Sequence, residues 1–149
     1  MIDTFKEIKT WFELAIPTPT EDNKRVQLGV HLEEVCEMVD EFLLRSPENV
    51  LGNYPALTEQ LTTVANRLKQ DKLIEVSITN RTEFLDSLCD QVVTAIGVAH
   101  MNGFDILGAL AEVSASNSSK FVDGKPIFNE HGKIAKGPSY FKPNLTKFV

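Results

Sequence analysis

Apolar residues recur at helical spacing along most of the chain, which predicts an all-α protein. A first helix is predicted over 3–15 and stops before Pro17, because a proline disfavours helical backbone in the residue that precedes it. The longest apolar stripe predicts a second helix over 21–45, with steps alternating between four and three residues. The remaining predicted helices cover about 57–68, 80–102 and 105–117. Thr20 is expected to open the helix at 21, and Asp105 is the expected N-cap of the last helix.

The fourth of these helices is expected to be the buried centre of the fold. A capping box formed by Asn80 and Glu83 opens it, and Gly103 ends it. Residues 92–99 are apolar on nearly every side, and a helix without a polar face is normally covered by other elements. A free carboxylate at Asp90, one turn before this stretch, would then be costly.

The character of the chain changes at about residue 118, where glycine, proline, lysine and aromatic residues become frequent. The segments 126–128 and 133–135 flank a polar turn, which predicts a small hairpin followed by an irregular tail. Residues 73–80 are compatible with either an extended or a helical segment. The expectation is a single domain, a four-to-five-helix bundle with a helical core over about 1–117 and a basic tail over about 118–149.

Composition narrows the class of protein. No apolar run approaches the roughly 20 residues that a membrane-spanning helix needs, and the charged N-terminus is unlike a signal peptide. The net charge of −6 argues against binding to a nucleic-acid polymer, which requires clustered lysine and arginine. Cys36 and Cys89 lie among apolar neighbours and are expected to be buried, reduced thiols. These features favour a cytoplasmic protein.

Two predicted helices each carry a row of acidic residues on one face. The first row is Glu34, Glu37 and Glu41, and the second is Glu83, Asp86 and Asp90. A solvated face explains the first row, and capping by Glu83 with a helix-dipole role for Asp86 explains part of the second. Like charges on one face repel, however, and Mg²⁺ relieves that repulsion because it prefers oxygen ligands. Two such faces in one small protein favour a divalent metal site.

Other catalytic patterns do not occur in the sequence. There is no phosphate-binding glycine loop ending in Lys-Ser or Lys-Thr, no H-E-x-x-H and no Glu-x-x-His pair. The three histidines are scattered and are interpreted as structural or solvated. Lysines beside glycines and aromatic residues in the tail suit phosphate contact and base stacking, although a solvated tail packed by its aromatic residues is equally compatible with the pattern.

Three stretches of the chain resemble the MazG-like superfamily of all-α nucleoside triphosphate pyrophosphohydrolases, especially its compact phage-type and mobile-element-type members. The first stretch is Leu32-Glu33-Glu34-Val35-Cys36-Glu37, which resembles the family's E-E-x-x-E helix. The second is the segment at 83–90, which resembles the family's second acidic helix. The third is the tail, which contains the motifs S-N-x-S-K, D-G-K-P-I and G-K-x-x-K-G-P-x-Y-F-x-P. The resemblance covers about 26–145, with a poorly matched insertion at roughly 47–78. The tail pattern is the most specific of the three.

The resemblance implies a bundle of the all-α NTP pyrophosphatase type, built across a homodimer that often pairs into a homotetramer. It also implies Mg²⁺-dependent hydrolysis of a nucleoside or deoxynucleoside triphosphate to the monophosphate and pyrophosphate, with Mn²⁺ as a substitute metal. The same chemistry on phosphoribosyl-ATP or on a nucleotide-sugar is an alternative. A non-catalytic helical interaction module is another.

The resemblance also assigns roles to residues, position by position. The residues that it implies are Glu33, Glu34 and Glu37 for catalysis, Glu34, Glu37, Asp86 and Asp90 for the metal, and Asn117, Lys120, Lys136 and Tyr140 for the substrate. One position departs from the family pattern: Ser87 stands where the fourth metal ligand is usually a glutamate. Asp86 is the expected replacement, with Glu83 as the alternative.

Overall fold

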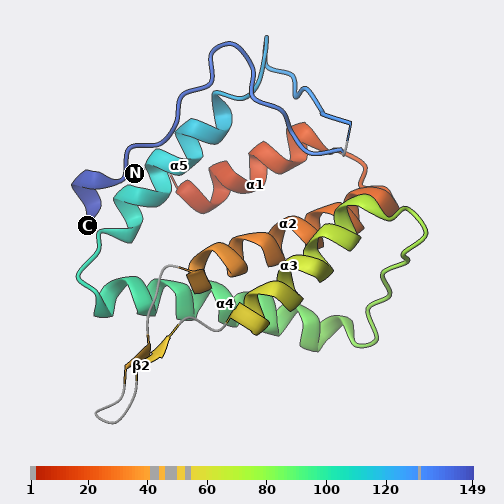
Figure 1. Cartoon of the computed structure of the whole chain (residues 1–149). Coiled ribbons are helices and arrows are strands. Elements are labelled where there is room, and N and C mark those ends of the chain that lie inside the picture. Colours follow the sequence, from red (N-terminus) through yellow and green to blue (C-terminus); the bar gives the residue numbers. More distant parts are fainter. Residues whose placement is uncertain (1–2, 41–43, 46–49, 53–54, 131) are drawn as a thin grey trace. The chain divides into compact units, whose positions relative to one another are not determined.

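The computed structural model describes the whole chain except residues 1–2, 41–43, 46–49, 53–54 and 131. The described part contains five α-helices: α1 (Thr4–Ala15), α2 (Glu21–Asp40), α3 (Pro55–Gln70), α4 (Arg81–Met101) and α5 (Ile106–Ser118) (Figure 1). A short 3₁₀ helix, η1 (Thr146–Phe148), closes the chain, and two very short strands, β1 (Leu44–Arg45) and β2 (Val50–Gly52), form a hairpin between α2 and α3. The predicted all-α class is confirmed.

Three helices begin at the capping residues that the sequence indicates. The hydroxyl oxygen of Thr20 accepts a hydrogen bond from the backbone N–H of Asn23 at 3.2 Å, at the start of α2. The side chains of Asn80 and Asp105 accept backbone N–H groups in the first turns of α4 and α5 in the same way. Gly103 follows α4 with a φ of +77°, the left-handed conformation that favours glycine after a helix. These local signals predicted the helix boundaries correctly.

The predicted end of the second helix at residue 45 is wrong. α2 ends at Asp40, and Leu44 and Arg45 instead form β1, which pairs antiparallel with β2. Apolar spacing along one segment does not reveal that another segment will supply backbone hydrogen bonds to it. The structure also resolves the ambiguous residues 73–80, which form neither a helix nor a strand.

The chain divides into two compact units. The first consists of Met1–Pro17, Ser77–Asn129 and Ile134–Val149, and therefore contains α1, α4, α5 and most of the tail. The second consists of Thr18–Val76 and Glu130–Lys133, and contains α2, α3 and a short piece of the tail. The expectation of one domain stays a prediction.

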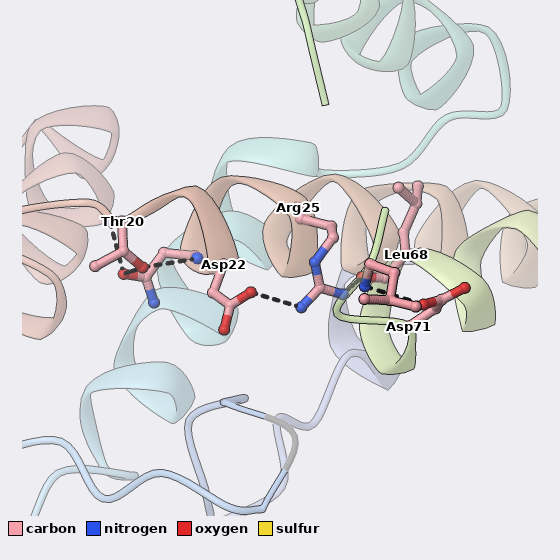
Figure 2. Close-up of polar contacts among 7 residues, drawn as sticks. Thr20, Asp22, Arg25, Leu68 and Asp71 are labelled. Carbon is pink, nitrogen blue, oxygen red and sulfur yellow. Dashed lines mark hydrogen bonds and ion pairs between the residues drawn. The ribbon is translucent and has the colours of Figure 1, made fainter. Parts of the chain in front are cut away.

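In the second unit, α2 and α3 pack closely because Gly29 leaves room for the facing helix. A Cβ atom at Gly29 would lie 2.8 Å from the carbonyl oxygen of Ala65. Arg25 is buried beside this contact, and its guanidinium donates to the carbonyl of Leu68 and pairs with Asp22 at 2.9 Å (Figure 2). The arginine thereby joins the start of α2 to the end of α3.

In the first unit, α1 packs against α5. The indole N–H of Trp11 donates to the backbone carbonyl of Asn117 at 3.0 Å, and the indole ring stacks on Phe121 with ring centroids 5.5 Å apart. At the other end of α5, the backbone N–H of Asp105 donates to the carbonyl of Phe148 at 2.8 Å. The C-terminal 3₁₀ turn is thus held against the start of α5.

The expectation that α4 is a buried central helix is wrong. Within its unit α4 packs only against α5, and Leu85, Val93 and Val98 are 62%, 65% and 58% exposed. Cys89 on the same helix is exposed, whereas Cys36 on α2 is buried as predicted. An apolar pattern on every side correctly identifies an apolar helix, but it does not say which surface covers that helix.

The tail forms the predicted small hairpin only as isolated bridges. Phe128 pairs antiparallel with Ile134, and the backbone N–H of Ala135 donates to the carbonyl of Ile127 at 2.7 Å. Apart from η1, the residues that follow are irregular, as expected. Across the part of the chain that is described, no helix has the length and apolar character needed to cross a membrane.

Candidate functional site

Glu33 on α2 is fully engaged by lysines. Its Oε1 atom lies 2.6 Å from the Nζ of Lys69 on α3, and its Oε2 atom lies 2.8 Å from the Nζ of Lys133 in the tail. The hydrogen bonds from Lys133 and Lys69 hold the pKa of the Glu33 carboxyl below its usual value, although partial burial opposes them. In this arrangement both carboxylate oxygens of Glu33 already have cationic partners.

Glu34 and Glu37 lie one helical turn apart on α2, and unlike Glu33 they are not paired with lysines in the described part of the chain. Both are exposed, and neither side chain has a hydrogen bond or ion pair among the described residues. By contrast, the acids in the first turn of the same helix pair with nearby basic residues, as in Glu21 with Lys24 at 2.6 Å. Glu41, the third acid of the predicted row, lies outside the described residues. α2 therefore presents two unpaired carboxylates to solvent.

α4 presents a second pair of the same kind. Asp86 and Asp90 are one turn apart and exposed, and their carboxylates have no partner within the described ranges of the chain. The exposure of Asp90 removes the burial cost that was expected for it. Ser87 does not extend this pair, because its hydroxyl donates to the backbone carbonyl of Glu83 at 2.9 Å.

The two acid pairs belong to different units, Glu34 and Glu37 to the second and Asp86 and Asp90 to the first. Among the residues that the structure describes, no three or more histidine, cysteine or acidic side chains form a group able to hold a metal ion. Mg²⁺ does not require such a cage, because it is commonly bound by one or two carboxylates together with substrate phosphates and water. Each exposed pair fits that requirement in number and in atom type.

The four residues implied for substrate binding lie near one another at the C-terminal end of α5. The Nζ of Lys120 donates to the side-chain oxygen of Asn117 at 2.6 Å, and the Nζ of Lys136 lies 4.8 Å from the ring centroid of Tyr140. Gly137, which follows Lys136 in the sequence, lies close to the first pair, because a Cβ atom added to it would lie 2.8 Å from the backbone carbonyl oxygen of Lys120. The structure thus forms one pair from Asn117 and Lys120 and another from Lys136 and Tyr140, and it places the backbone after Lys136 next to that of Lys120. These four residues are here called the tail cluster.

Two serines of the S-N-x-S-K motif, to which the sequence analysis assigned no role, hold the tail in this position. The hydroxyl of Ser116, which is 2% exposed, donates to the backbone carbonyl of Phe141 at 2.7 Å. The hydroxyl of Ser119 accepts the backbone N–H of Phe141 at 3.1 Å and donates to the carbonyl of Ser116 at 2.7 Å. The motif marks both positions, but nothing local in the sequence identifies a backbone partner 22 or 25 residues away.

Comparisons with protein-family models, with curated proteins and with solved structures give no match to this chain. The resemblance to the MazG-like superfamily therefore remains a prediction that rests on the motifs themselves.

Proposed function

We propose that the protein is a Mg²⁺-dependent nucleoside triphosphate pyrophosphohydrolase that acts on ribonucleoside or deoxyribonucleoside triphosphates. The observation that carries the proposal is the lack of pairing at the four implied metal ligands. Glu34, Glu37, Asp86 and Asp90 are exposed and have no partner among the residues that the structure describes, while the neighbouring Glu33 is neutralised by two lysines. A carboxylate pair one turn apart with no cation is disfavoured by repulsion and is suited to a divalent ion.

The tail cluster supports the substrate half of the proposal. Lys120 and Lys136 supply positive charge for phosphate oxygens, and the ring of Tyr140 supplies an aromatic surface next to them. Such a cluster gives an acidic protein of net charge −6 a local site for a polyanionic ligand. Exposed carboxylates thus account for the metal ligands, and exposed or half-buried residues of the tail cluster account for the groups that bind the polyphosphate.

The proposed reaction is the addition of water across the bond between the α and β phosphates. The water oxygen bonds to phosphorus, the bridging P–O bond breaks, and pyrophosphate and a nucleoside monophosphate leave with the release of one proton. Carboxylates of the two pairs would hold Mg²⁺, which would supply positive charge to the phosphate oxygens and make water easier to deprotonate. A carboxylate of the pairs that is not engaged with metal accepts the proton from water, and the lysines of the tail cluster hold the departing phosphates.

The direct test measures pyrophosphate release from the eight natural triphosphates in the presence of Mg²⁺, with phosphoribosyl-ATP and a nucleotide-sugar in the same panel. Glu34→Gln, Glu37→Gln and Asp90→Asn are each expected to reduce turnover at least a hundredfold, because each removes a charged metal ligand. Glu21→Gln is the matched control, since Glu21 is also an exposed acid of α2 but pairs with Lys24. The proposal fails if no member of the panel is hydrolysed, and turnover of only the last two substrates would favour the alternative substrate class.

The exposed apolar residues of α4 favour a homodimer, which pairs into a tetramer in the family that the chain resembles. Leaving Leu85, Val93 and Val98 in water costs roughly 25 cal/mol for each Å² of apolar surface, so association that covers them is favourable. Sedimentation of the protein at micromolar concentration is expected to show at least a dimer, and Val93→Glu to shift it toward monomer. A wild-type monomer would contradict this part of the proposal.

The same exposed apolar residues of α4 favour a non-catalytic interaction module as the second candidate. The two candidates differ in their response to metal, because a solvated acidic face gains little from a divalent ion. A thermal transition that is unchanged by Mg²⁺ and by Mn²⁺, together with association through α4, would favour the interaction module.

A further inference from the structure

A groove runs between α1 and α5 in the first unit, with a volume of about 820 Å³. Ligand sites in proteins commonly measure about 300–1,000 Å³, so the groove has the size of a small-molecule site. The two helices that form it lie side by side (Figure 1). None of the acid pairs or the four residues of the tail cluster lines it.

The α5 wall of the groove is made of small residues. Ala111, Ser114, Ala115 and Ser118 are three or four positions apart, and therefore share one face of the helix. Their short side chains leave space between α5 and α1 that larger residues would fill. Small residues alone do not make a site, so the other two features of the groove are decisive.

The first feature is an aromatic pair on the groove. Trp11 and Phe121 both line it, and their rings are nearly parallel, with an interplanar angle of 24°. The indole cannot rotate freely because its N–H is bonded to the carbonyl of Asn117 at 3.0 Å. A fixed aromatic pair provides apolar contact area for a planar ring at low entropic cost.

The second feature is the hydroxyl of Ser114. Ser114 is only 6% exposed, yet its side chain has no hydrogen-bond partner among the described residues. Every wholly buried side-chain nitrogen or oxygen in that part of the chain has a partner, so the unpartnered Ser114 oxygen is not wholly buried. Ser114 is also a lining residue of the groove. It can donate one hydrogen bond to a ligand and accept others.

We propose that this groove binds the nucleoside part of the triphosphate, with the base against Trp11 and Phe121 and the Ser114 hydroxyl bonded to a polar edge of the nucleoside. The inference rests on the proposed hydrolysis of nucleoside triphosphates. Ser118 and Phe121 line the groove, while Asn117 and Lys120 are their immediate neighbours at the end of α5. A nucleoside in the groove therefore has its phosphates next to the tail cluster.

Trp11 makes the test direct, because it is the only tryptophan in the chain. Its fluorescence, excited beyond nucleobase absorption, is followed during titration with adenosine, guanosine, cytidine, uridine and thymidine, without phosphate or Mg²⁺. At least one nucleoside is expected to quench the emission saturably. Ser114→Ala is expected to weaken that binding about threefold to tenfold, the value of one hydrogen bond.

Ala115→Leu fills the groove and is expected to abolish saturable quenching, provided that circular dichroism shows an unchanged helix content. Ala56→Leu is the matched control, since it enlarges an exposed alanine on α3 that does not line the groove. Quenching that is absent for all nucleosides at millimolar concentration, or that persists unchanged in both Ser114→Ala and Ala115→Leu, overturns the groove assignment.

The outcomes for the groove and for hydrolysis are separable. Saturable nucleoside binding that Ala115→Leu abolishes, in a protein that releases no pyrophosphate, retains the groove and removes the proposed activity. Pyrophosphate release with an unchanged KM in Ala115→Leu retains the activity and removes the groove.

Discussion

Replacement of Arg25 by methionine tests whether the α2–α3 pair depends on one buried guanidinium. Arg25 is 3% exposed and donates to the carbonyl of Leu68 in the last turn of α3. The last four carbonyls of a helix have no partner within the helix, so this side chain satisfies a group that α3 leaves open. Methionine keeps most of the apolar stem and removes the charge and the donors.

The expected loss of stability has two contributions. Leaving the Leu68 carbonyl buried without a donor costs about 1–3 kcal/mol. Removing a cation from the C-terminal end of α3 adds about 0.3–1 kcal/mol through the helix dipole. The ion pair with Asp22 adds little, because the Asp22 side chain is 61% exposed. Together these effects predict a destabilisation of roughly 2–3 kcal/mol.

Thermal unfolding followed by circular dichroism measures this change. For a protein of this size each kcal/mol lowers the transition by about 2–4 °C, so the variant is expected to unfold roughly 5–10 °C earlier. Lys24→Met is the matched control: it removes the neighbouring cation of an exposed pair and is expected to change stability by less than about 0.5 kcal/mol. Equal midpoints for the two variants would refute the reasoning.

Three further predictions concern charge, metal and helix packing. Glu33→Gln is expected to destabilise the protein at about pH 7 and to have little effect at about pH 3. A carboxyl with a lowered pKa stabilises the fold above its unfolded-state pKa and loses that contribution as the pH falls through its folded-state pKa. An effect on stability that is independent of pH in chemical denaturation would contradict this prediction. Saturating Mg²⁺ is expected to raise the thermal midpoint of the wild type and of Glu21→Gln but not of Glu37→Gln, as differential scanning fluorimetry will show. Gly29→Ala is expected to destabilise by about 1–3 kcal/mol, because the new Cβ meets the backbone of α3 at 2.8 Å. Gly97→Ala, with nothing within 4 Å, is expected to stabilise by about 0.5–1 kcal/mol, and the same sign for both glycines in urea titrations would exclude this interpretation.

The sequence by itself determined the helical class and most helix boundaries. The caps at Thr20, Asn80 and Asp105 and the stop at Gly103 were readable because each acts on backbone groups within four residues. The one-turn spacing of Glu34 and Glu37 was readable for the same reason, since helical geometry alone places both side chains on one face.

Only the tertiary structure separated Glu33 from its neighbour Glu34. In the sequence they are adjacent glutamates of one motif, yet Glu33 meets Lys69 and Lys133, which lie 36 and 100 residues away along the chain. The structure likewise places Leu44 and Arg45, predicted to be helical, in β1, which pairs with β2. In each case the outcome depends on a partner distant in sequence, which local periodicity does not contain.

The exposure of α4 and the groove at Ser114 also depend on segments that are distant in the sequence. Whether an apolar helix is covered, and whether a serine hydroxyl finds a partner, depends on the packing of other elements around it. Local backbone chemistry is therefore readable from neighbouring residues, whereas burial, ion pairing and cavities are decided only when distant segments meet.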